Sequence, residues 1–340
     1  MKPVSALPTI IQGGMGVAVS NWRLARAVSL RGHLGVVSGT AFDTVLIRRL
    51  QDGDHSGHMR RAIARFPIPG VGATALERFF LPYGRPSGQP YKLLPMYKHR
   101  VSRDRQQLTM LANFVEVSLA KEGHEGVVGL NLLTKVQMPT LASLYGAMLA
   151  GVDYILMGAG IPREIPGALD ALSEHRTASL RFEVEGLPGT EPLHITLEPG
   201  EMGADISTPL KRPAFLPIIS ASSLATTLAR KANGSVEGFI VEGPTAGGHN
   251  APPRGEPRFN DRGEPLYGER DVSTSTSFAI WDCPSGWPVA PVRQLGSLMR
   301  SPQVPQEFRW EHCSHSAKSR ALPIISSAMC LITQFVVILK

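Results

Sequence analysis

Short runs of apolar residues recur along the first 271 residues, and polar or amphipathic stretches separate them. The runs are four to seven residues long and lack strict alternation. This is typical of strands that are buried on both faces of a parallel sheet. The pattern predicts six strands, at residues 9–12, 34–38, 127–133, 154–157, 216–220 and 238–242.

Helix-like stretches lie between these strands, and Asn21 and Ser222 are well placed as helix N-caps. Two insertions depart from the repeat: residues 66–105 are rich in Pro, Gly and basic side chains, and residues 180–198 have the pattern of a hairpin. The repeated strand–helix order predicts a parallel α/β fold. The predicted helices are 21–30, 44–66, 108–121, 141–149 and 222–231.

Glycine-rich or polar tips follow several of the predicted strands. In a (β/α)₈ TIM barrel all such tips face one end of the fold, whereas a doubly wound sheet gathers them only at its switch point. Six strands also suit an open sheet, but the tips favour a barrel of which residues 1–271 supply strands 1–6. The tips are at residues 12–15, 38–40, 131, 158–160 and 246–249.

Composition narrows the class of protein. Hydrophobic residues make up 43% of the 340, enough for a sizeable core, and the net charge of +7 is not concentrated in a stripe, so we expect no nucleic-acid partner. The N-terminus lacks the pattern of a secretory signal. All three cysteines follow residue 271, at spacings that suit neither a disulfide framework nor zinc. We therefore expect a cytoplasmic protein without a membrane span.

The first candidate site is the glycine cluster directly after the first predicted strand, where Gly13, Gly14 and Gly16 surround Met15. Glycines there let backbone N–H groups approach a flat or anionic ligand closely. The other interpretation is a plain strand-to-helix turn. The spacing matches neither the dinucleotide fingerprint nor a P-loop.

The second candidate site is the loop after the sixth predicted strand, with the sequence EGPTAGGH over residues 242–249. His249, which follows two glycines in the loop at the carboxyl end of a strand, is suited to act as a general base near neutral pH. The alternative is a solvated histidine without a role. No second metal-ligating residue stands at ligand spacing, so no metal is expected.

Other polar segments are weaker candidates for a functional site. A basic run between residues 98 and 105 is able to contact phosphates, but a solvated face is favoured because no aromatic residue interleaves it. His55 and His58 are expected to be exposed. Residues 252–271 suit a lid over the site or a plain surface loop. The basic run consists of Lys98, His99, Arg100, Arg103 and Arg105.

Three motifs in this order carry a family resemblance: IIQGGMG at residues 10–16, GLN at 129–131 and VEGPTAGGH at 241–249. Together they resemble the nitronate monooxygenases, formerly called 2-nitropropane dioxygenases. The resemblance runs from about residue 8 to Asp271. It implies an FMN-dependent TIM barrel that oxidises alkyl nitronates with O₂ to a carbonyl compound and nitrite, without a metal.

The resemblance also assigns site residues. His249 would take a proton from the carbon beside a nitro group. Many members carry Gln at the position of Glu242, and a carboxylate there would disfavour the electron-rich reduced flavin. The residues that would line the flavin are Gly13, Gly14, Met15, Asn131, Glu242, Gly243, Ala246, Gly247 and Gly248.

The chain changes character after Asp271. Residues 272–340 contain three acidic and six basic residues with eleven serines, and they offer no pair of strands that would complete a barrel. When the reading frame is shifted by one base, the codons near Trp281 force or permit GLPFWLAGG, and those of residues 309–314 force or permit VGTLF. The first is an apolar strand that ends in a glycine loop, and the second is an apolar strand with a Gly-Thr tip. We therefore expect residues 272–340 to be an aberrant, frameshifted segment.

Two consequences follow if the printed chain is the real one. The barrel would stay open with unpaired sheet edges, and the uncharged residues 321–339 would form an aggregation-prone tail. Two alternatives to a nitronate oxidase remain: another FMN barrel such as an enoyl-ACP reductase, and an inactive, interrupted product. The substrate within the nitronate class and the oligomeric state are not predicted.

Overall fold

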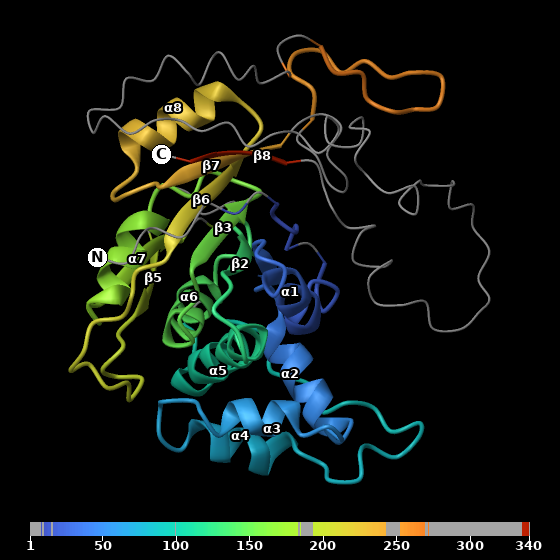
Figure 1. The fold of residues 1–340 in the computed structure, drawn as a ribbon, viewed down its shortest axis with the longest axis vertical. Coiled ribbons are helices and arrows are strands. Elements are labelled where there is room, and N and C mark those ends of the chain that lie inside the picture. The colour runs from blue at the N-terminus through green and yellow to red at the C-terminus, as the bar shows by residue number, and fades with distance from the viewer. Residues whose placement is uncertain are drawn as a thin grey trace.

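The computed structural model describes residues 8, 10–14, 16–98, 100–182, 184, 193–242, 252–268 and 271, together with the backbone of residues 335–339. These form an α/β fold around a six-stranded sheet (Figure 1). The strands of that sheet are β1 (Gly35–Ser38), β2 (Val128–Leu133), β3 (Tyr154–Gly158), β6 (Ala214–Ile219), β7 (Gly238–Glu242) and β8 (Phe335–Leu339).

The first five of these strands are parallel and lie side by side in the order in which they occur along the chain. The first predicted strand precedes them as a single parallel bridge between Ile11 and Leu34. All six predicted strand positions are therefore confirmed, the first in reduced form. No reversal of strand order, the mark of a doubly wound sheet, occurs among the described parallel strands.

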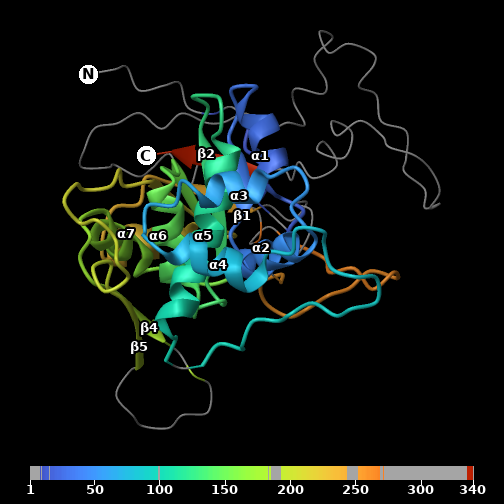
Figure 2. The ribbon, with the colours of Figure 1, turned by 90° about the horizontal axis from the view of Figure 1, so that it is seen from below.

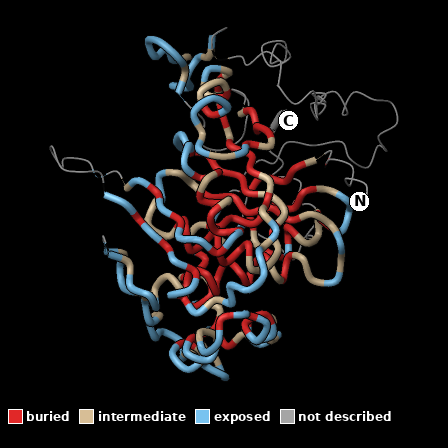
Figure 3. The backbone as a smooth tube through the Cα atoms, turned by 90° about the vertical axis from the view of Figure 1, so that its left-hand side faces the viewer, coloured by how far each residue is buried: buried red, intermediate tan, exposed pale blue. Residues whose placement is uncertain are grey.

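The two faces of the sheet are covered differently. Val37, Leu130 and Phe215 belong to the large core that the helices share. Alternate residues on the same strands, such as Val36 and Leu156, belong to a second cluster formed only by residues in the strands or directly beside them. Figure 3 shows the buried tube concentrated around the sheet. The second cluster consists of Ile11, Leu34, Val36, Leu156, Leu216 and Ile240, with Val127, Tyr154 and Ile218 against it.

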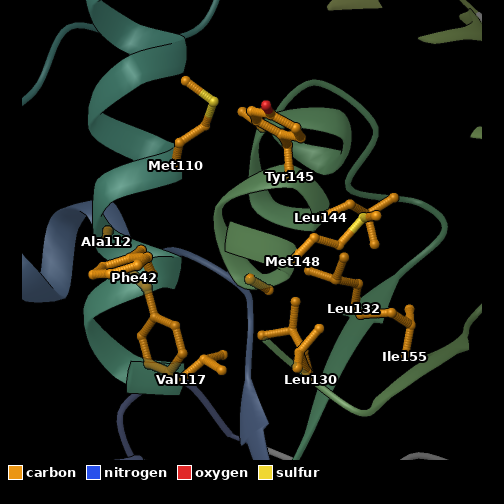
Figure 4. Packing of buried hydrophobic residues seen from close by; sticks show 14 of the residues in the cluster. Phe42, Met110, Ala112, Val117, Leu130, Leu132, Leu144, Tyr145, Met148 and Ile155 are labelled. Atoms are coloured by element: carbon orange, nitrogen blue, oxygen red, sulfur yellow. The ribbon is translucent and has the colours of Figure 1, made fainter. Parts of the chain in front are cut away.

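Eight helices occur in the described part of the chain. The closest packing joins α5 to α6, where a Cβ on Gly146 would lie 2.1 Å from the carbonyl oxygen of Met110. Phe42, Leu130 and Tyr145 fill the adjoining core (Figure 4). The helices are α1 (Trp22–Ser29), α2 (Phe42–Gln51), α3 (His58–Ile63), α4 (Val71–Phe79), α5 (Arg103–Ala120), α6 (Thr140–Leu149), α7 (Ile165–Ser173) and α8 (Ser222–Lys231).

The helix predictions needed three corrections. The single helix predicted over 44–66 is two helices, α2 and α3, because Gly53 and Gly57 adopt positive φ angles between them. Helices α4 and α7 were not predicted. Asn21 is confirmed as an N-cap that accepts from the N–H groups of Arg23 and Leu24, but Ser222 is the first helical residue and not the cap.

Both insertions form structures of their own. The second is an antiparallel hairpin of β4 (Ala178–Phe182) and β5 (Leu193–Leu197), as predicted. The first contains α4, and Figures 1 and 2 place α3 and α4 beyond α5, at the end of the molecule opposite β7 and β8. Residues 252–268 form an exposed loop with one bridge between Phe259 and Pro265.

The C-terminal strand changes one expectation. β8 pairs with β7 in antiparallel register, with Phe335 opposite Glu242. The edge of β7 is therefore paired, where the sequence predicted an unpaired edge. The sheet is not closed within the described residues. The rest of 272–340 lies outside them, so the division of the chain at residue 271 stays a prediction.

Candidate functional site

The carboxyl ends of the parallel strands carry polar residues on the face of the strand-only cluster. Side chains alternate along a strand, so Ser38 shares its face with Val36, and Glu242 shares its face with Ile240. Asn131 lies two residues beyond Gly129, whose added Cβ would contact Val36 and Leu156. The cluster is thus apolar in its body and polar at the end where the loops begin.

The side chain of Gln12 anchors the turn after the first strand, which we call the glycine turn (Gln12, Gly13 and Gly14). Its Oε1 accepts the N–H of Val36 at 3.0 Å, in the position that a main-chain carbonyl takes in a regular ladder. Its Nε2 donates to the carbonyl of Gly13 and to Ser20 Oγ at 3.2 Å. Ser20 Oγ donates to the same carbonyl at 3.0 Å. Gln12 is 1% exposed, so these bonds are shielded from water.

Gly14 is required by packing against protein rather than by access to a ligand. A Cβ at this position would lie 2.6 Å from both Asn131 Cβ and Val36 Cγ1, distances that real Cβ contacts do not reach. Asn131 Nδ2 donates to the Gly14 carbonyl at 3.1 Å. For Gly14 the strand-to-helix turn is therefore the better interpretation, and Asn131 holds that turn against β2.

The glycine turn nevertheless presents buried donors. The N–H groups of Gly13 and Gly14 donate to no acceptor among the residues that the structure describes. The Gly13 carbonyl is turned toward Gln12 and Ser20, and in a trans peptide the following N–H points the opposite way. The Gly14 N–H therefore faces away from those two side chains. Buried backbone donors normally have a partner, so the turn is suited to an acceptor other than the residues that the structure describes.

Glu242 lies on the same face and at the same end of the sheet as Asn131, but the two residues are far apart. It lies three strands away, roughly 14 Å along the sheet at the usual strand spacing. Asn131 is level with Leu156 and Leu216, and Ile218 is level with Ile240. Glu242 therefore also projects about four residues further toward the carboxyl end.

The other predicted site residues lie outside the described part of the chain. They are Met15, Gly243, Ala246, Gly247, Gly248 and His249. The structure thus brings together Gly13, Gly14 and Asn131, and it leaves the predicted base and the AGGH loop untested.

A second polar cluster lies at the start of α2 and was missed by the sequence analysis. Asp43, only 4% exposed, accepts from Tyr97 Oη at 3.0 Å, from Thr109 Oγ1 at 3.3 Å and from Arg105 Nη2 at 2.9 Å. Burial, with the nearby charge of Asp43, raises the pKa of Tyr97 far above its usual value. No sequence spacing links these residues, because the insertion carries Tyr97 back to α2.

This cluster corrects the interpretation of the basic run. Lys98, Arg100 and Arg103 are exposed as predicted, but Arg105 is largely buried and stacks on the ring of Tyr97, 4.3 Å from its centroid. His58 is half-buried, with its ring 5.0 Å from that of Trp22, and not exposed.

A third buried polar group joins three helices away from the sheet end. Glu116 of α5 is paired with Arg49 of α2 and accepts the N–H of Trp22 at the start of α1 at 3.0 Å. Burial raises the pKa of Glu116, against the opposing effect of Arg49. Because all its partners are structural, we assign Glu116 to helix packing.

The described residues contain no group of three or more His, Cys, Asp or Glu side chains that is able to hold a metal ion. No helix among them combines the length and the apolar character needed to cross a membrane.

Comparison with known proteins gives a weak likeness to solved structures. No family model matches the chain, and no curated protein matches it either. Among solved structures the chain is similar to FabK from Thermotoga maritima, with 16% identity and a TM-score of 0.32; the match covers 72% of this chain and 43% of that one. The chain therefore spans less than half the length of FabK, and a TM-score this low does not establish a shared fold.

Proposed function

We propose that the chain is an FMN-dependent oxidoreductase of the (β/α)₈ barrel type that oxidises alkyl nitronates with O₂ to a carbonyl compound and nitrite. FMN, when bound, would pass electrons from the substrate to O₂. The observation that carries the proposal is the glycine turn at the carboxyl end of a parallel sheet, whose buried N–H groups have no acceptor among the described residues. The three sequence motifs supply the substrate class.

The strand-only cluster supports the barrel. In a doubly wound sheet helices cover both faces, but in a barrel the inner face is filled by side chains of the strands themselves. Val36, Leu156, Leu216 and Ile240 contact one another in this way without a helix. Five parallel strands in sequential order also match strands 2–6 of a barrel.

The described residues suit part of a flavin site. A flavin ring offers carbonyl oxygens and ring nitrogens as acceptors, and the N–H groups of Gly13 and Gly14 are donors for which no described residue provides an acceptor. Gln12, Ser20 and Asn131 fix the carbonyls of the same turn on the protein side. This chain would therefore hold the edge of the ring through its backbone.

His249 is the proposed base, and its removal should affect neutral nitroalkanes and preformed nitronates differently. Deleting the imidazole in His249→Ala should abolish turnover of neutral nitroalkanes, which need a proton removed from carbon, and should retain turnover of preformed nitronates. Unchanged turnover of nitroalkanes would remove His249 from the mechanism.

The reaction class is tested by products. Nitrite release from an alkyl nitronate under air supports the proposal, whereas NADH or NADPH oxidation that depends on an enoyl thioester selects an enoyl reductase in its place. A purified full chain that is colourless in the blue and binds no added FMN would indicate an inactive product.

We also propose that residues 272–340 result from a frameshift. Nucleotide sequencing across codons 265–320 of the source DNA tests this directly. A base missing or added near codon 272 supports the proposal, and an unbroken printed frame refutes it.

A further inference from the structure

A pocket of about 310 Å³ lies between the first insertion and the start of α5, and we call it the insertion pocket. None of its residues belongs to the glycine turn or to the proposed flavin contacts. Its volume is at the lower end of those that bind small molecules. It is lined by Arg78, Leu94, Pro95, Met96, Tyr97, Lys98, Arg100, Val101, Ser102, Asp104, Arg105 and Leu108.

The charges around the pocket are strongly unequal. Four cationic side chains line it (Arg78, Lys98, Arg100 and Arg105), against the single acid Asp104. Asp104 is 3.8 Å from Arg78, and both side chains are well exposed, so that pair is weak. When Asp43 is counted as the partner of Arg105 and Asp104 as the partner of Arg78, two positive charges of the pocket remain uncompensated.

The side chain of Arg105 is fixed in place, and two of its three nitrogen atoms have no acceptor among the described residues. Its Nη2 is bonded to Asp43 and its guanidinium lies over the ring of Tyr97. Its Nε and Nη1 are buried and have no hydrogen-bond partner in the described part of the chain. Donors of this kind normally have an acceptor, so the guanidinium that lines the pocket keeps hydrogen-bonding capacity that no described residue uses.

The apolar lining narrows the ligand further. Leu94, Val101 and Leu108 contribute surface that a bare inorganic anion would leave in contact with water. A ligand that uses the whole pocket therefore has an apolar part and a charged part. Because several cations meet here, a dianionic group gains more than a monoanionic one.

We propose that the insertion pocket binds a phosphate monoester that carries an apolar or aromatic body. The phosphate lies among Lys98, Arg100 and Arg105, and the body packs beside Leu94 and Leu108. Such binding is separate from the oxidation chemistry and does not need flavin.

Isothermal titration of the full chain at low salt tests the proposal with three probes. Phenyl phosphate should bind saturably and about tenfold or more tightly than inorganic phosphate, which lacks the ring, or benzoate, which lacks the second charge. Equal affinity for inorganic phosphate would refute the apolar body, and equal affinity for benzoate would refute the phosphate. Absence of saturable binding would overturn the proposal as a whole.

A charge-matched pair of variants locates the site. The variant Arg100→Gln removes one exposed cation of the pocket and should weaken phenyl phosphate binding about threefold or more. The control is Arg103→Gln, an exposed arginine of the same segment that does not line the pocket, and it should have a much smaller effect. An equal loss in both proteins would assign the binding to general charge and contradict the proposal.

Discussion

The glycine turn and the insertion pocket are both polar regions, but they are built in opposite ways. The turn joins residues of adjacent strands, and its bonds run between main chain and the neutral side chains of Gln12, Ser20 and Asn131. Two residues that line the pocket, Tyr97 and Arg105, are held by the buried carboxylate of Asp43, which precedes them by more than 50 positions. The turn is therefore held by sheet register, and the wall of the pocket by a buried carboxylate of α2 that pairs with Arg105.

The largest loss of stability should come from the carboxylate that holds the wall of the pocket. Asp43→Asn removes the buried carboxylate that compensates Arg105, and it should lower the free energy of unfolding by about 3 kcal/mol. Urea denaturation measures this. The control Asp104→Asn changes an exposed acid and should stay near the wild type; equal stability of the two variants would refute the ion-pair account.

The next largest loss of stability should come from a substitution in the glycine turn. Gly14→Ala places a Cβ against Asn131 and Val36 and should cost about 2 kcal/mol, because neither neighbour is free to move away. The control is Gly200→Ala, where an added Cβ meets nothing within 4 Å. A destabilisation no larger than that of the control would show that the turn is loose.

A smaller loss is expected from Gln12→Ala, which leaves the N–H of Val36 without its acceptor. The cost should be about 1–2 kcal/mol in urea denaturation. Gln89→Ala, at an exposed position, serves as the control. No difference between the two would mean that the side chain of Gln12 does not replace the ladder bond.

The smallest effect depends on pH and distinguishes the charged region from the neutral one. Burial raises the pKa of Tyr97 in the folded chain, so the folded state binds the proton more tightly and stability should fall as the pH rises above about 10. Tyr97→Phe should reduce this alkaline loss by about 1 kcal/mol per pH unit. The exposed Tyr83 provides the control variant Tyr83→Phe; identical alkaline slopes for both variants would contradict the assignment.

The comparison also explains what the sequence could predict. Strand positions, the hairpin and the grouping of Gly13, Gly14 and Asn131 follow from local patterns, because adjacent parallel strands bring their carboxyl ends together. The Asp43–Arg105 pair and the break between α2 and α3 depend on where an insertion returns and on two glycine φ angles. Neither leaves a periodic signal. The role of Gly14 was only half predicted, since a glycine needed for packing and one needed for a ligand look alike in sequence.

In the proposed flavin site, the N–H groups of Gly13 and Gly14, which have no acceptor among the described residues, bind the flavin. Amide hydrogen exchange, resolved to single residues within 10–20 of the full chain and measured with and without FMN, tests it most directly. We predict that FMN slows exchange at Gly14 and leaves the amides of α8 unchanged. FMN binding with no change at Gly14, or a folded chain that binds no FMN, would contradict the account.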